Sequence, residues 1–590
     1  MSIKYFVGID LGTTNSSVAY SHAEEDSTNI KQYKIHQLIS EGLVDALEVL
    51  PSLIYIPSDK DFPAGSLDLP WSQSGPVVIG EMARREWSKA GHRVVHSSKS
   101  WLCHNSVDSK ERILPFKTSL DPDQKLSAFD ATHLLLSHIK DSWNYDYSQG
   151  SLAGKLEEQN IVITIPASFE PAARDATLEA AKAVGFETVL LLEEPQAALY
   201  SWIENQKDDW REKLAVGKSI LVCDIGGGTT DFSLMRTFDD SGNLGFQRIS
   251  VGNHILLGGD NMDLALSHLL RTKLKNAGHT PDDKQIASLQ AQARDAKEQI
   301  LSKGEEEVKV VLAGSGSSLF ASSMETTLTK SEVSKIVVEG FFCSVNSNER
   351  PKPHRGLGLR DAGLHYATDA SIFKHLAQFL GSQDENFHSP DLLLFNGSMF
   401  KAEILRDRVR EVISSWSDSE INELESLDFR LAVSRGAAYY SRVACGEGIR
   451  IKASLAYSYY IGVEKAEMAI PGLEPELSLV CIAPYGIEEG SCISLTEESF
   501  YLVTGETSQF RLFRSAFRQD SLGQRLDYND EEFEEVSSLE KFLETDSSNQ
   551  YIPVIIETDV TEIGTIDLFC ASTKSENQRW KLEFQVRDAN

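Results

Sequence analysis

Phe6-Val-Gly-Ile-Asp10-Leu-Gly12-Thr13-Thr14-Asn15 opens the chain, and the same pattern returns at Leu221-Val-Cys-Asp224-Ile-Gly226-Gly227-Gly228-Thr229-Thr230-Asp231. Each copy is an apolar strand that ends in aspartate, followed by a turn of Gly and Thr and by a second strand. Such a turn directs backbone N–H groups and Thr hydroxyls into one concavity, and its glycines let the backbone approach bulky phosphate oxygens. The doubled motif therefore predicts a phosphate site made of two similar hairpins.

The leading aspartates, Asp10 and Asp224, add negative charge beside the predicted phosphates, an arrangement that suits a bound Mg²⁺. Neither copy is a Walker A loop, because the chain has no G-x-x-x-x-G-K-[ST] and each turn joins two strands rather than a strand and a helix. The alternative is a pair of ordinary β-hairpins with Gly-rich turns. Two copies, each led by aspartate, favour the phosphate site over that alternative.

A third loop, Leu392-Leu-Leu-Phe395-Asn396-Gly397-Ser398, also follows an apolar strand, and a helix is expected from about Lys401. A helix N-terminus behind a turn of small residues can face a phosphate, a ribose or a base. By itself this signal is weak, and it gains meaning only beside the two hairpins.

Residues 1 to about 445 mix short apolar strands with amphipathic helices. Residues 161–165 and 189–192 are predicted as buried strands. Residues 171–184 are predicted as the helix between them, with Pro171 in its first turn and Gly185 at its end. Strand–helix–strand alternation of this kind predicts an α/β domain at 1–445.

From about residue 450 the helical pattern fades. Trp580, Leu582, Phe584 and Val586 alternate with charged and polar residues, which indicates a half-buried antiparallel strand, and residues 500–503 and 509–513 are predicted as strands as well. We therefore expect an all-β sandwich domain at 451–590. The acidic stretch 527–544 is expected to interrupt it as a loop or short helix. Polar stretches expected to be surface insertions are 57–75, 104–123 and 344–362.

The composition excludes several classes of protein. With 590 residues and 41% hydrophobic residues, the chain is expected to form two or three globular domains rather than a disordered or fibrous protein. The net charge of −31 disfavours nucleic acid and anionic membranes as partners. The seven cysteines form no C-x-x-C pair, so neither a zinc site nor a disulfide framework is expected. The sequence begins without a signal-peptide pattern, and we expect a cytoplasmic protein.

Further segments follow in the order of a known family. They are Ile165-Pro166-Ala-Ser-Phe169, Glu193-Glu194-Pro195-Gln-Ala-Ala198, Leu257-Gly258-Gly259-Asp260 with Asp263, and Ala432-Val-Ser-Arg-Gly436-Ala-Ala438. With the two hairpins and the third loop, they make residues 3 to about 445 resemble the heat-shock protein 70 (DnaK-like) branch of the actin/sugar-kinase/heat-shock ATPase superfamily. Gly462-Val463-Glu464 and residues 558–564 resemble, with much lower specificity, strand motifs of the β-sandwich substrate domain of that family.

The resemblance implies a duplicated actin-like (ribonuclease H-like) α/β ATPase domain that binds ATP or ADP with Mg²⁺ between two related halves. Lys99, in Ser97-Ser-Lys-Ser-Trp101, matches the family's catalytic lysine; a solvated surface lysine is the alternative. Pro166 and Arg174 match positions that relay the nucleotide state to the second domain. The implied catalytic residues are Lys99, Glu194, Asp224, Thr229 and Asp231. The implied nucleotide-binding residues are Asp10, Gly12, Thr13, Thr14, Asn15, Gly226, Gly227, Gly228, Gly258, Gly259, Asp260, Arg294, Lys297, Glu298, Gly397, Ser398 and Phe400, with Asp10, Asp224 and Asp231 holding Mg²⁺ through water.

The chain also departs from the family pattern. The family's adenosine-clamping helix carries Glu, Lys and Arg where this chain has Arg294, Lys297 and Glu298, and its adenosine loop carries Arg where this chain has Phe400. We expect Phe400 to stack on the purine; the alternative is that it packs the base of its helix. The junction at 445–451 lacks the family's leucine-rich linker. The sequence ends at Asn590, where the family has a helical lid, so a lidless member is expected.

The resemblance implies an ATP-dependent, chaperone-like protein that hydrolyses ATP slowly and thereby regulates the binding of polypeptide segments. Its implied partners are an unfolded or extended polypeptide, together with a J-domain co-chaperone, a nucleotide-exchange factor or a second protein subunit. Two alternatives stay open: a small-molecule kinase of the same superfamily, and a binding module in which ATP sets the conformation with little hydrolysis. The heat-shock segments and the all-β second domain favour the chaperone over the kinase.

Overall fold

The computed structural model divides the chain into two compact units. The first comprises Met1–Phe169, Ala173–Leu244 and Val251–Arg450, and the second comprises Ile451–Asn590 with the short segments Glu170–Ala172 and Gly245–Ser250. The structure describes residues 3–25, 29–58, 61–73, 75–104, 107–148, 150–169, 171–207, 209–240, 243–253, 255–313, 323–352, 363–381, 389–417, 421–426, 428–451, 455, 457–465, 477–488, 490–505, 507–515, 518, 520–529, 532–542, 551–560, 566–575 and 578–582.

The first sheet of the larger unit has the order β11-β10-β1-β2-β3, and β6 also pairs with β2. Its central strand β1 runs parallel to β10 and forms an antiparallel hairpin with β2, while β10 runs parallel to β11. The strands are β1 (Tyr5–Leu11), β2 (Asn15–His22), β3 (Lys31–Tyr33), β6 (Val49–Pro51), β10 (Asn160–Ile165) and β11 (Val189–Glu193).

A second sheet has the order β14-β13-β12-β17-β18; its strands belong to this unit except for Gly245–Ser250 of β14. β12 forms an antiparallel hairpin with β13 and runs parallel to β17, which runs parallel to β18. β12 therefore has the same kinds of neighbour as β1: one hairpin partner and one parallel partner. The strands are β12 (Ser219–Ile225), β13 (Thr230–Asp240), β14 (Asn243–Val251), β17 (Leu392–Asn396) and β18 (Asn422–Leu424).

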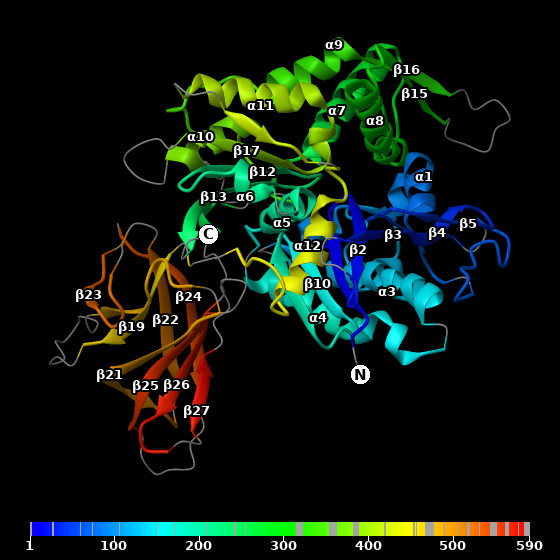
Figure 1. The fold of residues 1–590 in the computed structure, drawn as a ribbon. Coiled ribbons are helices and arrows are strands. Elements are labelled where there is room, and N and C mark those ends of the chain that lie inside the picture. Colours follow the sequence, from blue (N-terminus) through cyan, green and yellow to red (C-terminus); the bar gives the residue numbers. More distant parts are fainter. Residues whose placement is uncertain are drawn as a thin grey trace, which may run out of the picture. The chain divides into compact units, whose positions relative to one another are not determined.

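Two helices at the centre of the unit, α5 (Glu194–Gln206) and α12 (Ala432–Val443), pack against each other (Figure 1), and α12 also packs on β1. A Cβ added at Gly436 of α12 would lie 1.7 Å from the carbonyl oxygen of Ala197, and one added at Gly8 of β1 would lie 2.2 Å from the nitrogen of Ala438. Both positions need glycine because the backbones approach too closely for a side chain.

The remaining elements surround these sheets. α1 packs against α8, and both appear side by side in Figure 1. The helices, including short 3-10 and π segments, are α1 (Glu81–Ala90), η1 (Gly91–Arg93), α2 (Ser98–Leu102), η2 (Pro122–Gln124), α3 (Ala128–Tyr147), η3 (Leu152–Gly154), η4 (Leu156–Glu158), α4 (Pro171–Val184), α6 (Trp210–Lys213), α7 (Gly259–Asn276), α8 (Asp283–Lys303), α9 (Lys330–Val333), η5 (Ser334–Phe341), α10 (Ile372–Gly381), η6 (Ser398–Lys401) and α11 (Glu403–Ser415). The outer strands are β4 (Ile35–Ser40), β5 (Leu43–Leu47), β7 (Ile54–Tyr55), β8 (Val78–Ile79), β9 (Val94–Val95), β15 (Glu307–Leu312) and β16 (Met324–Thr329).

The smaller unit consists of two antiparallel sheets around one core. One sheet has the order β23-β20-β19-β22-β24 and the other β21-β25-β26-β27. Residues from both sheets, such as Val480 and Leu512 from one and Ile552 and Leu568 from the other, form a single buried cluster. The strands are β19 (Ser458–Glu464), β20 (Leu477–Ala483), β21 (Cys492–Val503), β22 (Thr507–Ser515), β23 (Arg525–Asp527), β24 (Glu534–Phe542), β25 (Tyr551–Val560), β26 (Ile566–Ser572) and β27 (Arg579–Leu582).

The prediction of a loop or short helix at 527–544 is wrong. Residues Glu534–Phe542 form β24, which pairs along β22. Val536 and Leu539 pack into the core, while the outward Glu535 forms an ion pair with Arg511 at 2.5 Å. The acidic side chains thus lie on the exposed face of a strand, where Glu534 and Glu535 pair with Arg514 and Arg511 of β22.

Several local predictions are confirmed. α4 begins at Pro171 and ends at Val184, with Gly185 at φ 102° behind it. The cysteines form no disulfide among the described residues: Cys223, Cys481 and Cys570 are buried as small core residues, whereas others, such as Cys492, are exposed. β15 and β16 pair as a hairpin, but the expected turn at 314–318 lies outside the described residues, as do Phe584 and Val586.

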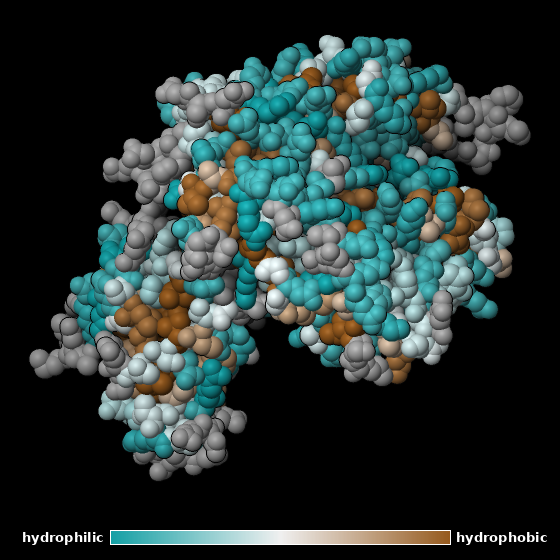
Figure 2. Space-filling view, in the orientation of Figure 1, coloured by the Kyte–Doolittle hydropathy of each residue, from teal (hydrophilic) through white to brown (hydrophobic). Residues whose placement is uncertain are grey.

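The visible face of the larger unit is mainly hydrophilic (Figure 2). Among the described residues, no helix has the length and apolar character needed to cross a bilayer.

Candidate functional site

The two Gly/Thr turns lie against each other. The first, Gly12–Asn15, connects β1 to β2, and the second, Gly226–Thr229, connects β12 to β13. A Cβ added at Gly227 would lie 2.0 Å from Thr14 Oγ1, and one added at Gly228 would lie 2.6 Å from Ser100 Oγ. Glycine is therefore required where the turns meet, and their N–H groups and hydroxyls share one small region.

Each turn begins next to an aspartate, of which Asp224 is buried and Asp10 is half-buried. Thr164 Oγ1 donates a hydrogen bond to Asp10 Oδ1 at 3.1 Å, and Asn396 Nδ2 donates to Asp224 Oδ2 at 2.8 Å. Ser168 Oγ donates a hydrogen bond to Asp231, which is paired with Asp224 in the β12–β13 hairpin. The strands thus hold three carboxylates in fixed orientations by bonds from neutral donors.

These carboxylates repel one another. Burial, and then the charge of Glu194, raise the pKa of Asp10 to about 7, although Lys99 opposes the shift. Burial, with the charges of Glu194 and Asp231, raises the pKa of Asp224 well above its usual range. Burial also raises the pKa of Asp231. The cluster carries more negative charge than its protein partners neutralise, so a cation is expected to bind there.

Lys99 supplies part of the missing positive charge. It lies on α2, is 9% exposed, and places Nζ 2.5 Å from Glu194 Oε1. Burial lowers its pKa, but Glu194 and Asp10 more than compensate, so the pKa of Lys99 is raised and the side chain is charged. The alternative of a solvated surface lysine does not describe this residue.

The acidic cluster fits a hydrated Mg²⁺ better than a directly bound metal. Among the described residues, no group of three or more His, Cys, Asp or Glu side chains is arranged to hold a metal ion directly. Mg²⁺ commonly keeps several waters and binds through few carboxylates together with substrate phosphates. Asp10, Asp224 and Asp231 carry acceptor oxygens, and contact of Mg²⁺ with them through water stays a prediction.

A third segment, Gly258–Asp260, is hydrogen-bonded to the second turn. The backbone N–H of Gly259 donates to Gly226 O at 3.1 Å, and that of Asp260 donates to Gly227 O at 2.7 Å. Asp260, near the start of α7, also accepts a 2.5 Å hydrogen bond from Ser97 Oγ. The segment therefore ties the second turn to the residues just before α2.

The three predicted adenosine-clamp residues on α8 behave differently from one another. Arg294 Nη2 donates to Thr14 Oγ1 at 2.9 Å. Lys297 Nζ lies 2.7 Å from Asp263 Oδ1, and both side chains are almost fully buried. Glu298 turns back along the helix to Arg294 and is 60% exposed.

The third loop reaches the site through Asn396 rather than through a helix N-terminus. A 3-10 turn, η6, follows Gly397, and α11 begins only at Glu403. Gly397 has φ 94°, and a Cβ there would lie 2.2 Å from Ile225 O, so only glycine fits against β12. Ser398 begins the 3-10 turn.

Phe400 is fully buried, with 0% of its surface exposed, and its ring centroid lies 4.5 Å from that of Phe395. In this position its ring has no open face for a purine. The arrangement matches the alternative in which Phe400 packs the base of its helix.

Several residues that line the site did not enter the predicted set. They are Ser97, Ser100, Thr164, Ser168 and Asn396, which orient the acids or touch the turns. All of them lie inside or beside the motifs named in the sequence analysis. Their short polar side chains next to charged residues could have indicated them from the sequence. Arg174, predicted as a relay position, is buried and donates to Phe169 O and Ala167 O, with Glu193 3.3 Å away.

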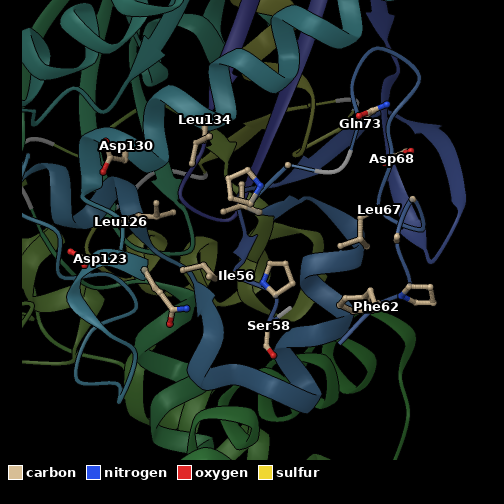
Figure 3. Close-up of a pocket in the computed structure, with 18 of the residues that line it drawn as sticks. Ile56, Ser58, Phe62, Leu67, Asp68, Gln73, Asp123, Leu126, Asp130 and Leu134 are labelled. Carbon is tan, nitrogen blue, oxygen red and sulfur yellow. The ribbon is translucent and has the colours of Figure 1, made fainter. Parts of the chain in front are cut away.

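A cavity of about 1040 Å³ lies elsewhere, between the segment around 56–77 and the beginning of α3 (Figure 3). Its lining includes Ile56, Phe62, Leu67, Leu126 and Leu134, and none of its lining residues belongs to the predicted nucleotide set. This cavity is therefore separate from the predicted nucleotide-binding residues.

Comparisons with known proteins show similarity to Hsp70-type chaperones. Residues 76–346 match the family profile described as "Hsp70 protein". The chain is 26% identical over 423 residues to the "Chaperone protein HscA homolog" of Shewanella baltica (strain OS195), which covers 68% of this chain and 58% of that protein. It is 28% identical over 340 residues to the HscA homolog of Colwellia psychrerythraea, covering 56% of this chain and 46% of that protein. It is 30% identical over 295 residues to the "Chaperone protein DnaK" of Thermosipho melanesiensis, covering 50% of this chain and 40% of that protein.

The first unit has an α/β fold with an acidic, Gly-lined site, and an all-β unit follows it in the chain. The profile and sequence matches make the chain similar to members of the Hsp70 family. The chain spans about half the length of the curated relatives that it matches.

Proposed function

We propose that the protein binds MgATP in the first unit, hydrolyses it slowly to ADP and phosphate, and uses the nucleotide to regulate the binding of polypeptide segments by the second unit. In this proposal the first unit is a duplicated actin-like ATPase domain. The support is the equivalence of β1 and β12, each with one hairpin partner, one parallel partner and an Asp next to its last residue.

The observation that carries the proposal is the meeting of the two turns beside a buried acid–lysine cluster. Thr14 of one turn lies against Gly227 of the other, and Lys99 is held at the same place by Glu194. Phosphoryl transfer to water needs positioning and charge neutralisation more than covalent help. This cluster offers both.

Each side chain has a defined task in this scheme. The hydroxyls and N–H groups of the turns bind phosphate oxygens, and Thr229 contributes from the second turn. Lys99 stabilises charge that grows on the phosphoryl group. Glu194 and Asp231 orient the attacking water and accept its proton, because their carboxylates lie in a buried region where an acceptor is effective. Bound Mg²⁺ would supply positive charge against the phosphate oxygens, with Asp10 and Asp224 as its acidic surroundings.

The second unit offers a surface suited to an extended polypeptide. β21 is the first strand of its sheet and, among the described residues, pairs only with β25. Tyr501 on β21 and Tyr551 on β25 are 72% and 59% exposed. An open strand edge with exposed aromatic side chains favours strand addition by an extended segment. We propose a J-domain co-chaperone, an exchange factor or a second subunit as further partners.

The test is ATP binding and phosphate release by the purified protein, with and without an unfolded polypeptide. We expect MgATP binding by calorimetry and slow phosphate release with no added acceptor, altered by the polypeptide. Absence of ATP binding in the presence of Mg²⁺ refutes the proposal. Formation of ADP only with a small-molecule acceptor, with the phosphoryl group recovered on that acceptor, indicates a kinase. Tight binding without turnover indicates an ATP-switched binding module.

A further inference from the structure

Arg294 on α8 extends its guanidinium to the first phosphate turn. Nη2 donates to Thr14 Oγ1 at 2.9 Å, and Nη1 lies 3.7 Å from Asp260 Oδ1. Nε lies 3.3 Å from Glu298 Oε1, and the guanidinium carbon lies 5.8 Å from the centre of the Trp87 ring. The side chain is 15% exposed. Its position is thus fixed from several sides, with one end at the turn.

Thr14 also lies against the second turn, since a Cβ on Gly227 would lie 2.0 Å from its hydroxyl oxygen. A cation bonded to Thr14 therefore lies at the junction of both turns. Arginine is always charged and presents donors in a planar fork that matches phosphate oxygens. The Thr hydroxyl is a neutral acceptor, and a phosphate oxygen is a stronger one.

Lys297, the neighbouring cation on α8, is less able than Arg294 to leave its protein partners for a ligand. Lys297 is 4% exposed and lies 2.7 Å from the buried Asp263, and it also donates to Gly259 O at 3.2 Å. Removing Lys297 from Asp263 would leave a buried carboxylate without its cation, which is costly. Of these two α8 cations, Arg294 is the one that can exchange a neutral partner for a charged ligand.

We propose that Arg294 is a phosphate-binding residue that makes the site prefer phosphorylated nucleosides to the nucleoside alone, and that it does not clamp the adenosine. This inference rests on the proposed nucleotide site. Arg294 stands on α8 where the family pattern has a glutamate. Its bond to Thr14 indicates that this position acts on the phosphate side of the ligand.

The test is calorimetry with adenosine, ADP and ATP, each with Mg²⁺, on the parent chain, Arg294→Gln and Arg84→Gln. Arg84 is the matched control, because it lies 3.3 Å from Asp295, next to Arg294 in sequence, but is 44% exposed and touches neither turn. A lost hydrogen bond to a charged group predicts that Arg294→Gln weakens ADP and ATP about 10- to 100-fold and leaves adenosine within about twofold. Arg84→Gln should leave all three affinities unchanged.

A second variant separates direct phosphate contact from charge compensation. If Arg294 only neutralises Asp260, the double variant Asp260→Asn/Arg294→Gln regains the parent affinity for ADP, and the inference is overturned. If Arg294 contacts phosphate, the double variant stays weak relative to Asp260→Asn alone.

Folding is checked in the same samples. Arg294→Lys keeps the charge and should recover part of the ADP affinity, which a merely misfolded site would not show. Equal losses for adenosine and ADP overturn the inference alone and indicate a role in clamping or in holding the cleft. A parent chain that binds adenosine but not ADP, or neither, overturns the proposed function together with the inference.

Discussion

The ammonium group of Lys99 and the carboxylate of Glu194 lie 2.5 Å apart, although the residues are separated by 95 positions in the sequence. Lys99 lies on the short helix α2, and Glu194 is the first residue of α5 directly after β11. Two separate segments therefore bring one cation and one acid to the ends of the phosphate turns. In the proposed function, this pair would hold the lysine where charge develops during phosphoryl transfer.

Lys99→Ala should nearly abolish ATP hydrolysis while nucleotide binding stays mostly intact. A donor that acts on charge growing in the transition state is commonly worth about 10²–10³ in rate. Single-turnover phosphate release measures the rate, and calorimetry measures the affinity. Lys89→Ala is the matched control, because Lys89 is 66% exposed and pairs with Glu86 on α1. Hydrolysis at the parent rate in Lys99→Ala would show that the catalytic assignment is wrong.

His138 should make the first unit less stable in mild acid. Burial lowers the pKa of His138 to about 4, and its Nε2 bonds the carbonyl oxygen of His36 at 2.9 Å. The unfolded chain, with a pKa near 6.5, takes up a proton between about pH 6.5 and 4 that the folded chain does not. The His138 contribution to the free energy of unfolding is therefore complete above about pH 6.5. It falls as the pH decreases, by at most about 3 kcal/mol.

His138→Gln should reduce this acid sensitivity, since an amide keeps a donor for His36 O but does not titrate. Urea unfolding between pH 4.5 and 7.5, followed by tryptophan fluorescence, reports mainly on the first unit because Trp580 is the only tryptophan beyond residue 450. The difference between parent and variant should grow in favour of the variant as the pH falls. A difference independent of pH would contradict the assignment to His138.

Phe400→Ala should destabilise the first unit rather than remove purine recognition. The side chain is fully buried against Phe395, so its truncation leaves a cavity, with a typical cost of about 3–5 kcal/mol. Phe400→Leu, which keeps most of the volume, should cost clearly less. ADP and inorganic phosphate analogues should lose affinity together in Phe400→Ala. Loss of ADP alone, with unchanged unfolding, would instead support stacking of Phe400 on the base.

The sequence indicated the parts of the structure that depend on local pattern. Pro171 and Gly185 delimit α4, because one restricts the first turn and the other adopts a positive φ behind the last. The two Gly/Thr turns were predicted because the same residue types recur after an apolar strand. Both signals lie within a few residues of what they specify.

The features that were missed depend on partners far away in the chain. The acidic residues of β24 indicated solvent, but Glu535 is paired with Arg511 on β22, and only the folded sheet brings them together. The position of Arg294 could be found in the sequence, yet its contact with Thr14, 280 residues away, could not. Tertiary packing also decided the environment of Phe400, which propensity does not reveal.

The exposed tyrosines of the second unit should carry part of the proposed polypeptide binding. Tyr501 lies opposite Pro553 and Tyr551 lies opposite Val503 in the β21–β25 pair, so all four belong to adjoining positions at one end of the sheet. Tyr501→Ser/Tyr551→Ser should weaken the binding of a labelled extended peptide about tenfold or more, since aromatic anchors at interfaces are commonly worth 1 kcal/mol or more each. Unfolding should change little, because both side chains are more than half exposed.

Tyr145→Ser is the matched control, being 51% exposed on α3 of the other unit. Fluorescence anisotropy measures the affinity. Unchanged peptide affinity in the double variant, with the parent binding the peptide, would show that the polypeptide contacts another part of the molecule.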